Sequence, residues 1–115
     1  MRPGAATPEE LETLFEDAFL VRDREALAGL FDDGAVLVAG GAGEARGAEI
    51  GRLAEVIWTG EFTYLAAPRR VLQANATGLV VAERGINVVR RGGDRRWRYA
   101  ISLLDNPDTI ERTDR

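Results

Sequence analysis

The feature that most constrains the fold is the order in which helical and strand-like hydrophobic spacing follow one another. Helical spacing comes first, because a capping box at Thr7-Pro8-Glu9-Glu10 opens a segment whose apolar residues recur every three or four positions. These apolar residues are Leu11, Leu14, Phe15, Ala18 and Phe19. A second, shorter helix is predicted from Asp23 through Phe31, ending at Asp32-Asp33-Gly34, where Gly34 suits a left-handed cap. Two amphipathic helices therefore precede the first strand.

The rest of the chain has strand-like patterns with one further helix. The expected elements are a strand over 35–39, a Gly-rich turn over 40–43, a return strand over 44–46, a helix over 48–58, and strands over 62–74, 79–91 and 95–104. Pro68 interrupts its strand and indicates an edge or a bulge. Residues 79–91 form either one long strand with a bulge at Gly85 or two short strands joined by a tight turn at 83–85.

Composition removes several classes of function. The chain contains no His, no Cys and no Lys, and all 15 basic residues are Arg. Thiolate catalysis, disulfides and thiolate metal sites are thereby excluded, and a net charge of −4 argues against a dedicated nucleic-acid-binding protein. We expect one domain over 7–107 with flexible tails at 1–6 and 108–115. No signal-peptide pattern and no membrane-length apolar run is visible, so the expected location is cytoplasmic.

Three segments carry a resemblance to a known superfamily. They are residues 23–36, the run Arg46-Gly47-Ala48-Glu49-Ile50, and residues 90–107 with their Trp97-Arg98-Tyr99. Their order and spacing resemble the nuclear-transport-factor-2-like superfamily, and most of all its SnoaL-like and ketosteroid-isomerase-like members. The resemblance implies an α+β fold in which a curved antiparallel sheet wraps around three N-terminal helices as a cone-shaped barrel with a central pocket. It also implies a homodimer formed through the outer face of the sheet.

The resemblance does not carry over the ketosteroid isomerase mechanism. That mechanism uses a carboxylate base with a Tyr and a protonated Asp as donors. By resemblance, the tyrosine position falls on Phe15, the base position near Ala39 and the acidic donor on Asn87. Neither Phe15 nor Ala39 can exchange a proton, so this chemistry is not expected. The Asp-Arg-Asp relay of epoxide-hydrolase relatives would fall on Glu83 and Arg84, whose side chains point to opposite faces of a strand.

The strand pattern predicts which side chains face the helices. In the last strand, the helix-facing set is Trp97, Tyr99, Ile101 and Leu103, and the opposite set is Arg98, Ala100 and Ser102. A three-residue loop at Gly92-Gly93-Asp94 places Arg91 opposite Arg95. The same loop puts Val81, Glu83, Asn87 and Val89 on the helix-facing side. A two-residue Gly-Gly turn would send Glu83 outward, since a shift by one residue reverses every side chain; we prefer the longer loop because it keeps the apolar faces together.

The candidate catalytic residues are Glu83, Asn87 and Tyr99. A carboxylate in an apolar pocket can exchange protons near neutrality, and the other two would polarise the substrate. Further expected ligand contacts are Phe15, Phe19, Val38, Trp58, Tyr64, Val81, Val89 and Trp97. The competing interpretation is that Glu83 is solvated or paired with an Arg, and that the aromatic residues are ordinary core.

Other motifs are better explained by structure than by binding. Gly40-Gly41-Ala42-Gly43 lacks the Lys and Ser/Thr of a phosphate loop and indicates a hairpin turn. The Arg-rich segment 90–98 indicates a solvated hairpin tip rather than a phosphate-binding surface. Asp32-Asp33 has no His or third acid nearby, so no metal is expected, and no cofactor either.

The sequence therefore predicts a small pocket protein for an apolar small molecule. The expected activity is cofactor-free acid/base chemistry, as in an isomerase, cyclase or hydrolase of a polyketide, steroid or terpenoid. The alternative is a non-catalytic ligand-binding or dimerisation domain. The expected partners are a small apolar molecule and a second copy of the chain, with no nucleic acid and no membrane.

Overall fold

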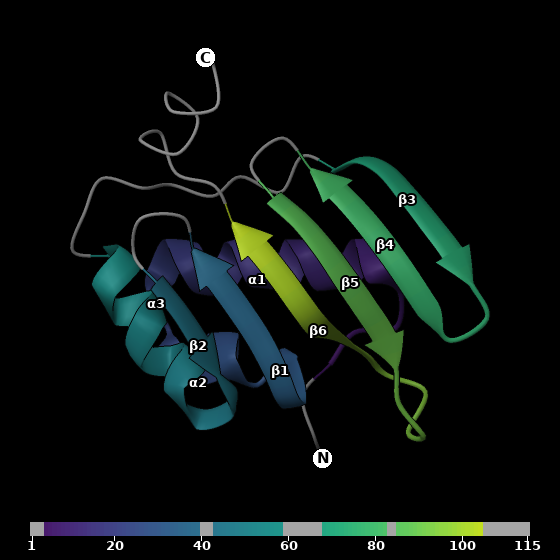
Figure 1. Cartoon of the computed structure of the whole chain (residues 1–115). Coiled ribbons are helices and arrows are strands. Elements are labelled where there is room, and N and C mark those ends of the chain that lie inside the picture. The colour runs from purple at the N-terminus through teal and green to yellow at the C-terminus, as the bar shows by residue number, and fades with distance from the viewer. Residues whose placement is uncertain (1–3, 40–42, 59–67, 83–84, 105–115) are drawn as a thin grey trace.

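Helices and strands of the chain form an α+β fold with one six-stranded sheet (Figure 1). The computed structural model describes residues 4–39, 43–58, 68–82 and 85–104, apart from the side chains of 57, 58, 68 and 69. Its elements are α1 (Pro8–Val21), α2 (Arg24–Ala28), β1 (Phe31–Ala39), β2 (Gly43–Arg46), a 3-10 turn η1 (Gly47–Glu49), α3 (Ile50–Trp58), β3 (Pro68–Ala74), β4 (Thr77–Ala82), β5 (Gly85–Arg91) and β6 (Trp97–Leu104). The strand order is β2-β1-β6-β5-β4-β3. Because β1 runs parallel to β6, the sheet is mixed, which corrects the expected antiparallel sheet.

The helices lie on one side of the sheet. α1 crosses behind it and contacts β3 and β6, while α2 and α3 pack together near the β1–β2 end (Figure 1). We call the face toward α1 the inner face and the opposite one the outer face. α3 follows the β1–β2 hairpin, so only α1 and α2 precede the sheet. The central pocket remains a prediction, because the described residues do not establish it.

The start of α1 follows the predicted capping box. The Glu10 backbone N–H donates to Thr7 Oγ1 at 3.0 Å, and Glu10 Oε1 accepts from the Ala6 N–H at 2.7 Å. Just before this cap, Ala5 is fully buried and exchanges two backbone hydrogen bonds with Trp97, at 2.7 and 3.1 Å. Ala5 therefore belongs to the folded domain, although the sequence placed it in a flexible tail.

The second helix is shorter than predicted. Asp23 caps it as expected, accepting from the Ala26 N–H at 3.1 Å, but α2 ends at Ala28 and Phe31 already begins β1. The reason is pairing with β6: Phe31 lies opposite Tyr99, whose N–H donates to the Leu30 carbonyl at 2.8 Å. Tertiary hydrogen bonding thus overrides the helical spacing of the apolar residues.

Residues 79–91 form two strands, as the alternative interpretation predicted. Ala82 of β4 lies opposite Gly85 of β5, and Glu83 and Arg84 between them are outside the described residues. The prediction of one long bulged strand is wrong. The β5–β6 loop also differs, since Arg91 lies opposite Trp97 and not opposite Arg95. The pairing partner of Arg91 is thus shifted by two residues. A shift by an even number leaves the faces unchanged, so Asn87 and Val89 lie on the inner face as predicted.

A bulge in β6 reverses the predicted faces of its second half. Val89 lies opposite Tyr99 and Val88 opposite Ile101, so Ala100 is the extra residue. Before the bulge Trp97 and Tyr99 are buried as predicted. After it the buried residues are Ser102 and Leu104, and the exposed ones are Ile101 and Leu103, each at 43% exposure. The prediction that Ile101 and Leu103 face the helices is therefore wrong.

Gly78 permits close contact between β3, β4 and β5. A Cβ atom at this position would lie 2.8 Å from Val89 Cγ2 and 3.4 Å from the Leu72 carbonyl oxygen. We expect Gly78→Ala to lower the free energy of unfolding by about 1–3 kcal/mol through overpacking, measured by urea denaturation. Gly93→Ala is the matched control, because a methyl group at that position would have no neighbouring atom of the described residues within 4 Å. Equal stability of the two variants would contradict this expectation.

Candidate functional site

The inner face carries a cluster of aromatic rings. The Phe15 ring of α1 meets the Tyr99 ring of β6 edge-on, with centroids 5.4 Å apart, and lies 5.9 Å from the Phe19 ring. Phe31 packs on Tyr99 at 5.2 Å. All four are buried, and such ring pairs add stabilisation beyond the burial of their area. This cluster joins α1 to the centre of the sheet.

Four buried polar residues lie beside the aromatic cluster, and we call them the polar quartet. They are Glu12 of α1, Asn87 of β5, and Tyr99 and Ser102 of β6, each no more than 1% exposed. Asn87 Nδ2 donates to Glu12 Oε2 at 3.1 Å, and the Tyr99 hydroxyl donates to the same oxygen. Ser102 Oγ donates to Asn87 Oδ1 at 2.5 Å.

The quartet places a carboxyl group in the interior of a small domain. A buried carboxylate is costly unless hydrogen bonds compensate for its lost hydration. Here donors from two strands converge on Glu12, and the Tyr99 hydroxyl also lies 3.4 Å from the Leu11 carbonyl oxygen. Such a group can hold a polar atom of a ligand or exchange a proton with it. The quartet is therefore our candidate site.

The structure brings together part of the site predicted from the sequence. Asn87 and Tyr99 belong to the quartet. Phe15, Phe19, Val89 and Trp97 are also buried. Val81 and Val38 are half-buried and lie on the outer face, opposite the exposed residues Ile86 and Leu103, so their predicted placement is wrong. Glu83, Tyr64 and the Trp58 side chain lie outside the described residues.

Glu12 and Ser102 were missed by the sequence analysis. A signal for Glu12 was present, because it falls within the apolar stripe of its helix, between Leu11 and Phe15 at positions that face the same way. A charged residue on an otherwise apolar stripe indicates a buried polar contact. No comparable signal existed for Ser102, since only the bulge at Ala100 turns it inward.

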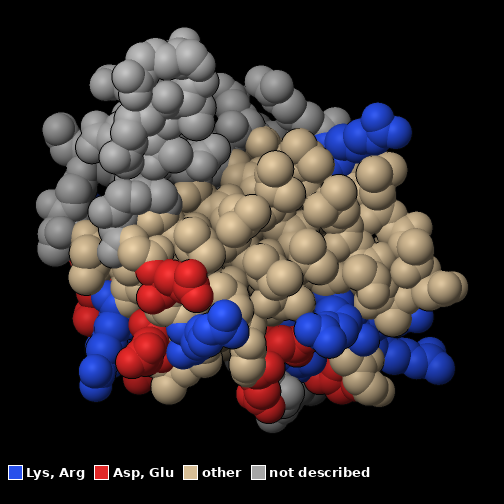
Figure 2. All heavy atoms as spheres, viewed as in Figure 1, with Lys and Arg blue, Asp and Glu red and all other residues tan. Residues whose placement is uncertain are grey.

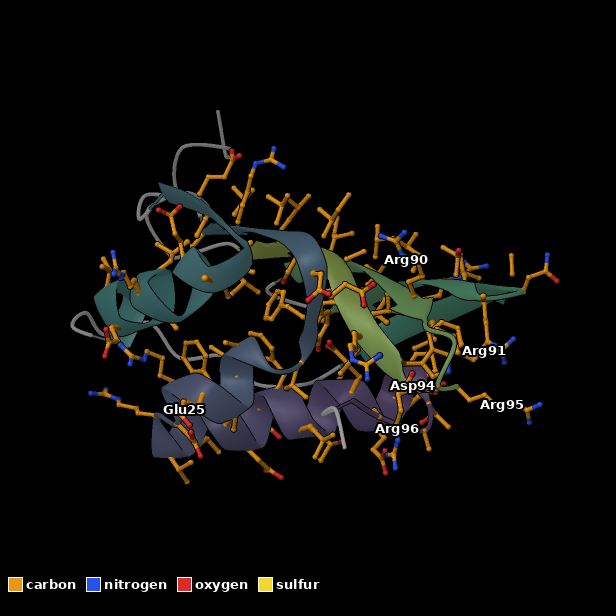
Figure 3. All side chains as sticks on the ribbon, turned by 90° about the horizontal axis from the view of Figure 1, so that it is seen from below. Glu25, Arg90, Arg91, Asp94, Arg95 and Arg96 are labelled. Carbon is orange, nitrogen blue, oxygen red and sulfur yellow. The ribbon has the colours of Figure 1, made fainter. Side chains whose placement is uncertain are left out.

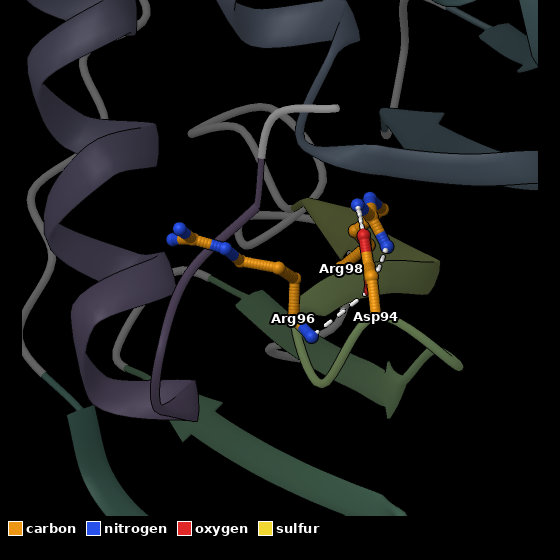
Figure 4. Close-up of polar contacts among 3 residues, drawn as sticks. All are labelled: Asp94, Arg96 and Arg98. Atoms are coloured by element: carbon orange, nitrogen blue, oxygen red, sulfur yellow. Dashed lines mark hydrogen bonds and ion pairs between the residues drawn. The ribbon is translucent and has the colours of Figure 1, made fainter. Parts of the chain in front are cut away.

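A second polar contact fixes the β5–β6 hairpin. Arg98, only 1% exposed, donates two hydrogen bonds to Asp94, from Nη1 to Oδ1 at 3.1 Å and from Nη2 to Oδ2 at 2.5 Å (Figure 4). Asp94 Oδ1 also accepts from the Arg96 N–H at 3.0 Å. The sequence predicted Arg98 on the face opposite the helices, but not that it would be buried and paired with Asp94 of the loop. We regard this contact as structural, because it is bidentate and closes its own loop.

This contact makes stability depend on pH. The Arg98 guanidinium and the Arg96 N–H hold the pKa of Asp94 well below its ordinary value of 3.8. A lowered folded-state pKa means that the stabilisation is fully present above about pH 3.8 and is lost as the pH falls below it. We therefore expect Asp94→Asn to be less stable than wild type at neutral pH, with the difference shrinking below pH 3.8. Urea midpoints measured from about pH 7 down to about pH 2 test this; a difference that stays constant with pH would contradict it.

The remaining hairpin arginines lie around this loop. Figure 3 shows Arg90, Arg91, Arg95 and Arg96 spread around the tip and pointing in different directions. Arg90 Nε lies 3.5 Å from Asp32 Oδ2, and the Arg91 guanidinium lies 5.8 Å from the centroid of the Trp97 ring. Their spread and their local partners fit the predicted hairpin tip better than a shared anion site.

An open groove lies between α2 and the start of α3. Its volume is about 290 Å³, and its lining residues are Arg24, Glu25, Ala28, Ala48, Gly51 and Arg52. Glu25 marks this region in Figure 3, at the opposite end of the molecule from the hairpin arginines. Arg24 pairs with Glu55 at 3.3 Å, and both side chains are about half exposed. Among the described residues that line the groove, no polar side chain is buried, and none of them belongs to the quartet.

The described part of the chain lacks the features of a metal centre and of a membrane span. It contains no group of three or more acidic, His or Cys residues placed to hold a metal ion. None of its helices combines the length and hydrophobicity needed to cross a bilayer.

Comparisons with known proteins show which solved structures have a similar fold. No protein-family model matches the chain. No curated protein matches it either. Among solved structures, an NTF2-like protein with a cystatin-like fold from Novosphingobium aromaticivorans is similar over 87% of this chain and 79% of its own, with a TM-score of 0.69 and 19% identity. A ketosteroid isomerase-like protein from Erwinia carotovora atroseptica is similar over 84% of this chain and 91% of its own, with a TM-score of 0.65 and 19% identity.

A SnoaL-like protein of unknown function from Burkholderia thailandensis is also similar. It covers 83% of this chain and 90% of its own, with a TM-score of 0.57 and 18% identity. At these identities the likeness concerns the fold. The resemblance stated from the sequence is confirmed at that level.

Proposed function

We propose that this chain, which has the fold of NTF2-like, ketosteroid isomerase-like and SnoaL-like proteins, binds a small apolar molecule between the inner face of its sheet and α1. The observation that carries the proposal is the polar quartet set beside the aromatic cluster. Binding sites for small molecules are mostly apolar with a few convergent polar groups. The inner face has this composition, with aromatic rings packed against the Tyr99 ring and a carboxyl group bound to its hydroxyl.

The chemistry that such a site supports is acid/base catalysis without a cofactor. Glu12 is the acid or base, and Asn87 and Tyr99 orient its carboxyl group. Such a group beside an apolar surface suits an isomerisation or a cyclisation of a polyketide, steroid or terpenoid and, with water as the co-reactant, a hydrolysis. Glu83, the acid predicted from the sequence, remains the rival for this role.

A ligand screen followed by two matched variants tests the proposal. Steroids, aromatic polyketides, terpenoid epoxides and fatty acids are tested for a rise in the melting temperature, since a ligand that binds the native state stabilises it by about 2.7 kcal/mol at a hundredfold excess over its Kd. Any turnover found is then measured for Glu12→Gln and Glu83→Gln. Loss of turnover in Glu12→Gln alone supports the assignment, and loss in Glu83→Gln alone transfers the role to that residue. No stabilisation by any ligand class would contradict the proposal.

A homodimer without catalytic activity is the second candidate, supported by the outer face. Four large apolar residues are between 43% and 46% exposed there: Leu72, Ile86, Ile101 and Leu103. Half-buried valines and a leucine continue this surface across the sheet; they are Val36, Val38, Leu79, Val81 and Val88. Figure 2 shows this face as a broad area without charged residues above a charged lower border. Contiguous apolar surface of this kind marks an association site.

Sedimentation velocity tests the dimer. We expect wild type to sediment as a dimer and Ile101→Asp to sediment as a monomer, because a carboxylate at the centre of the interface would lose its hydration. Leu20→Asp is the control, since Leu20 is 58% exposed on α1, away from the outer face. A wild-type monomer at high concentration would remove this candidate.

A further inference from the structure

The direction of the hydrogen bonds in the polar quartet indicates what kind of ligand it accepts. The bonds between its members all point the same way: Ser102 donates to Asn87, and both Asn87 and Tyr99 donate to Glu12. The chain of donors therefore ends on a carboxylate. The centre of the quartet is an acceptor of hydrogen bonds.

Ser102 fixes the orientation of the Asn87 amide. Its hydroxyl donates to Asn87 Oδ1 and leaves the Nδ2 side facing Glu12, 3.1 Å away. The reverse orientation would bring the amide oxygen against the carboxylate, and two acceptors repel each other. Asn87 is thus held as a donor toward Glu12.

The Tyr99 hydroxyl also donates toward Glu12. A tyrosine hydroxyl has a single proton to donate, and here it is directed at Glu12 Oε2. Donating to a carbonyl oxygen of a ligand would remove a charge-assisted bond from a carboxylate that is 1% exposed. A ligand carbonyl therefore competes with Glu12 for this proton, whereas a ligand donor does not.

We infer that the ligand presents a hydrogen-bond donor, a hydroxyl or an ammonium group, to Glu12, in place of a carbonyl oxygen presented to Tyr99. A carboxylate accepts up to about four hydrogen bonds over its two oxygens, so a donor from the ligand adds to those from the protein. This inference rests on the proposed function, because it concerns the same site. It differs from the role first predicted for Asn87 and Tyr99, which was to donate hydrogen bonds that polarise the substrate.

Three probes with one apolar body and different polar groups test the inference. They are adamantanol, adamantylammonium and adamantanone, titrated into the full chain by calorimetry. We expect the better of the two donor probes to bind about tenfold or more tightly than the ketone, the factor typical of one hydrogen bond to a charged group. The alcohol and the ammonium ion separate a neutral donor from a cationic one.

Glu12→Gln reverses the polarity of the site without changing its shape. The introduced amide oxygen can still accept from Tyr99 and Asn87, and its NH₂ group then faces the ligand as a donor. We expect the preference for donor probes to disappear or to shift to the ketone. Leu20→Ala, on the exposed side of α1, is the control and should keep the wild-type preference.

Tyr99→Phe provides a second variant if Glu12→Gln does not fold. The acceptor remains in place, so the donor preference should persist; selective loss of ketone binding would overturn the inference. Equal or tighter binding of the ketone by wild type would also overturn it, while leaving the proposed function standing. No binding of any probe would count against both.

Discussion

Phe15→Ala is expected to lower the free energy of unfolding by about 3–5 kcal/mol. The Phe15 ring is 1% exposed and contacts the rings of Phe19, Phe31 and Tyr99. Its removal leaves a cavity between α1 and the sheet and breaks three ring contacts at once. For a domain whose total stability is about 5–15 kcal/mol, this is a large fraction.

Urea denaturation followed by circular dichroism measures the loss. Leu20→Ala is the matched control on the same helix, because Leu20 is 58% exposed and should change stability by less than about 0.5 kcal/mol. A loss for Phe15→Ala below about 1 kcal/mol would show that the aromatic cluster does not hold α1 to the sheet.

Asn87→Asp is expected to destabilise the protein by about 3–5 kcal/mol at neutral pH. The change keeps the shape of the side chain but replaces the Nδ2 donor, 3.1 Å from Glu12 Oε2, with a second carboxylate oxygen. Both groups are 1% exposed, so water screens their repulsion poorly.

The double variant Asn87→Asp with Glu12→Gln should recover part of this loss, because the introduced amide can donate to position 87 but then no longer accepts from Tyr99 at the same atom. It exchanges the acid and the amide between α1 and β5 and restores one donor opposite one acceptor. A double-mutant cycle built from urea denaturation of the four proteins isolates the coupling between the two positions. Additive losses, with no recovery in the double variant, would contradict the direct contact between Glu12 and Asn87.

Local sequence signals predicted most of the elements, and the resemblance of three segments to a known superfamily implied the general fold. The capping residues Thr7 and Asp23 act where they were predicted, since their partners lie only three residues away. The boundary between α2 and β1 was wrong because it depends on Tyr99, almost seventy positions along the chain, which pairs with Phe31. The spacing of apolar residues indicates which face of a helix or strand is buried. It does not indicate where pairing with a distant strand begins.

The candidate site was likewise predicted only in part from the sequence. Tyr99 and Asn87 were predicted as site residues from strand alternation, and the structure joins them through Glu12. Glu12 was detectable in principle as a charge on the apolar stripe of α1. Which residue it would meet was not detectable, because Glu12 and Asn87 are separated by 75 positions in sequence.

By itself the sequence determined the helices, the strand-rich second half and the aromatic interior, because apolar spacing and capping act within a few residues. Only the tertiary structure decided the parallel pairing of β1 with β6, the inward turn of Ser102 and the burial of Arg98 against Asp94. A single extra residue at Ala100 shifts the strand by one position and exchanges its two faces. Register is set by pairing between distant segments, so local spacing cannot encode it.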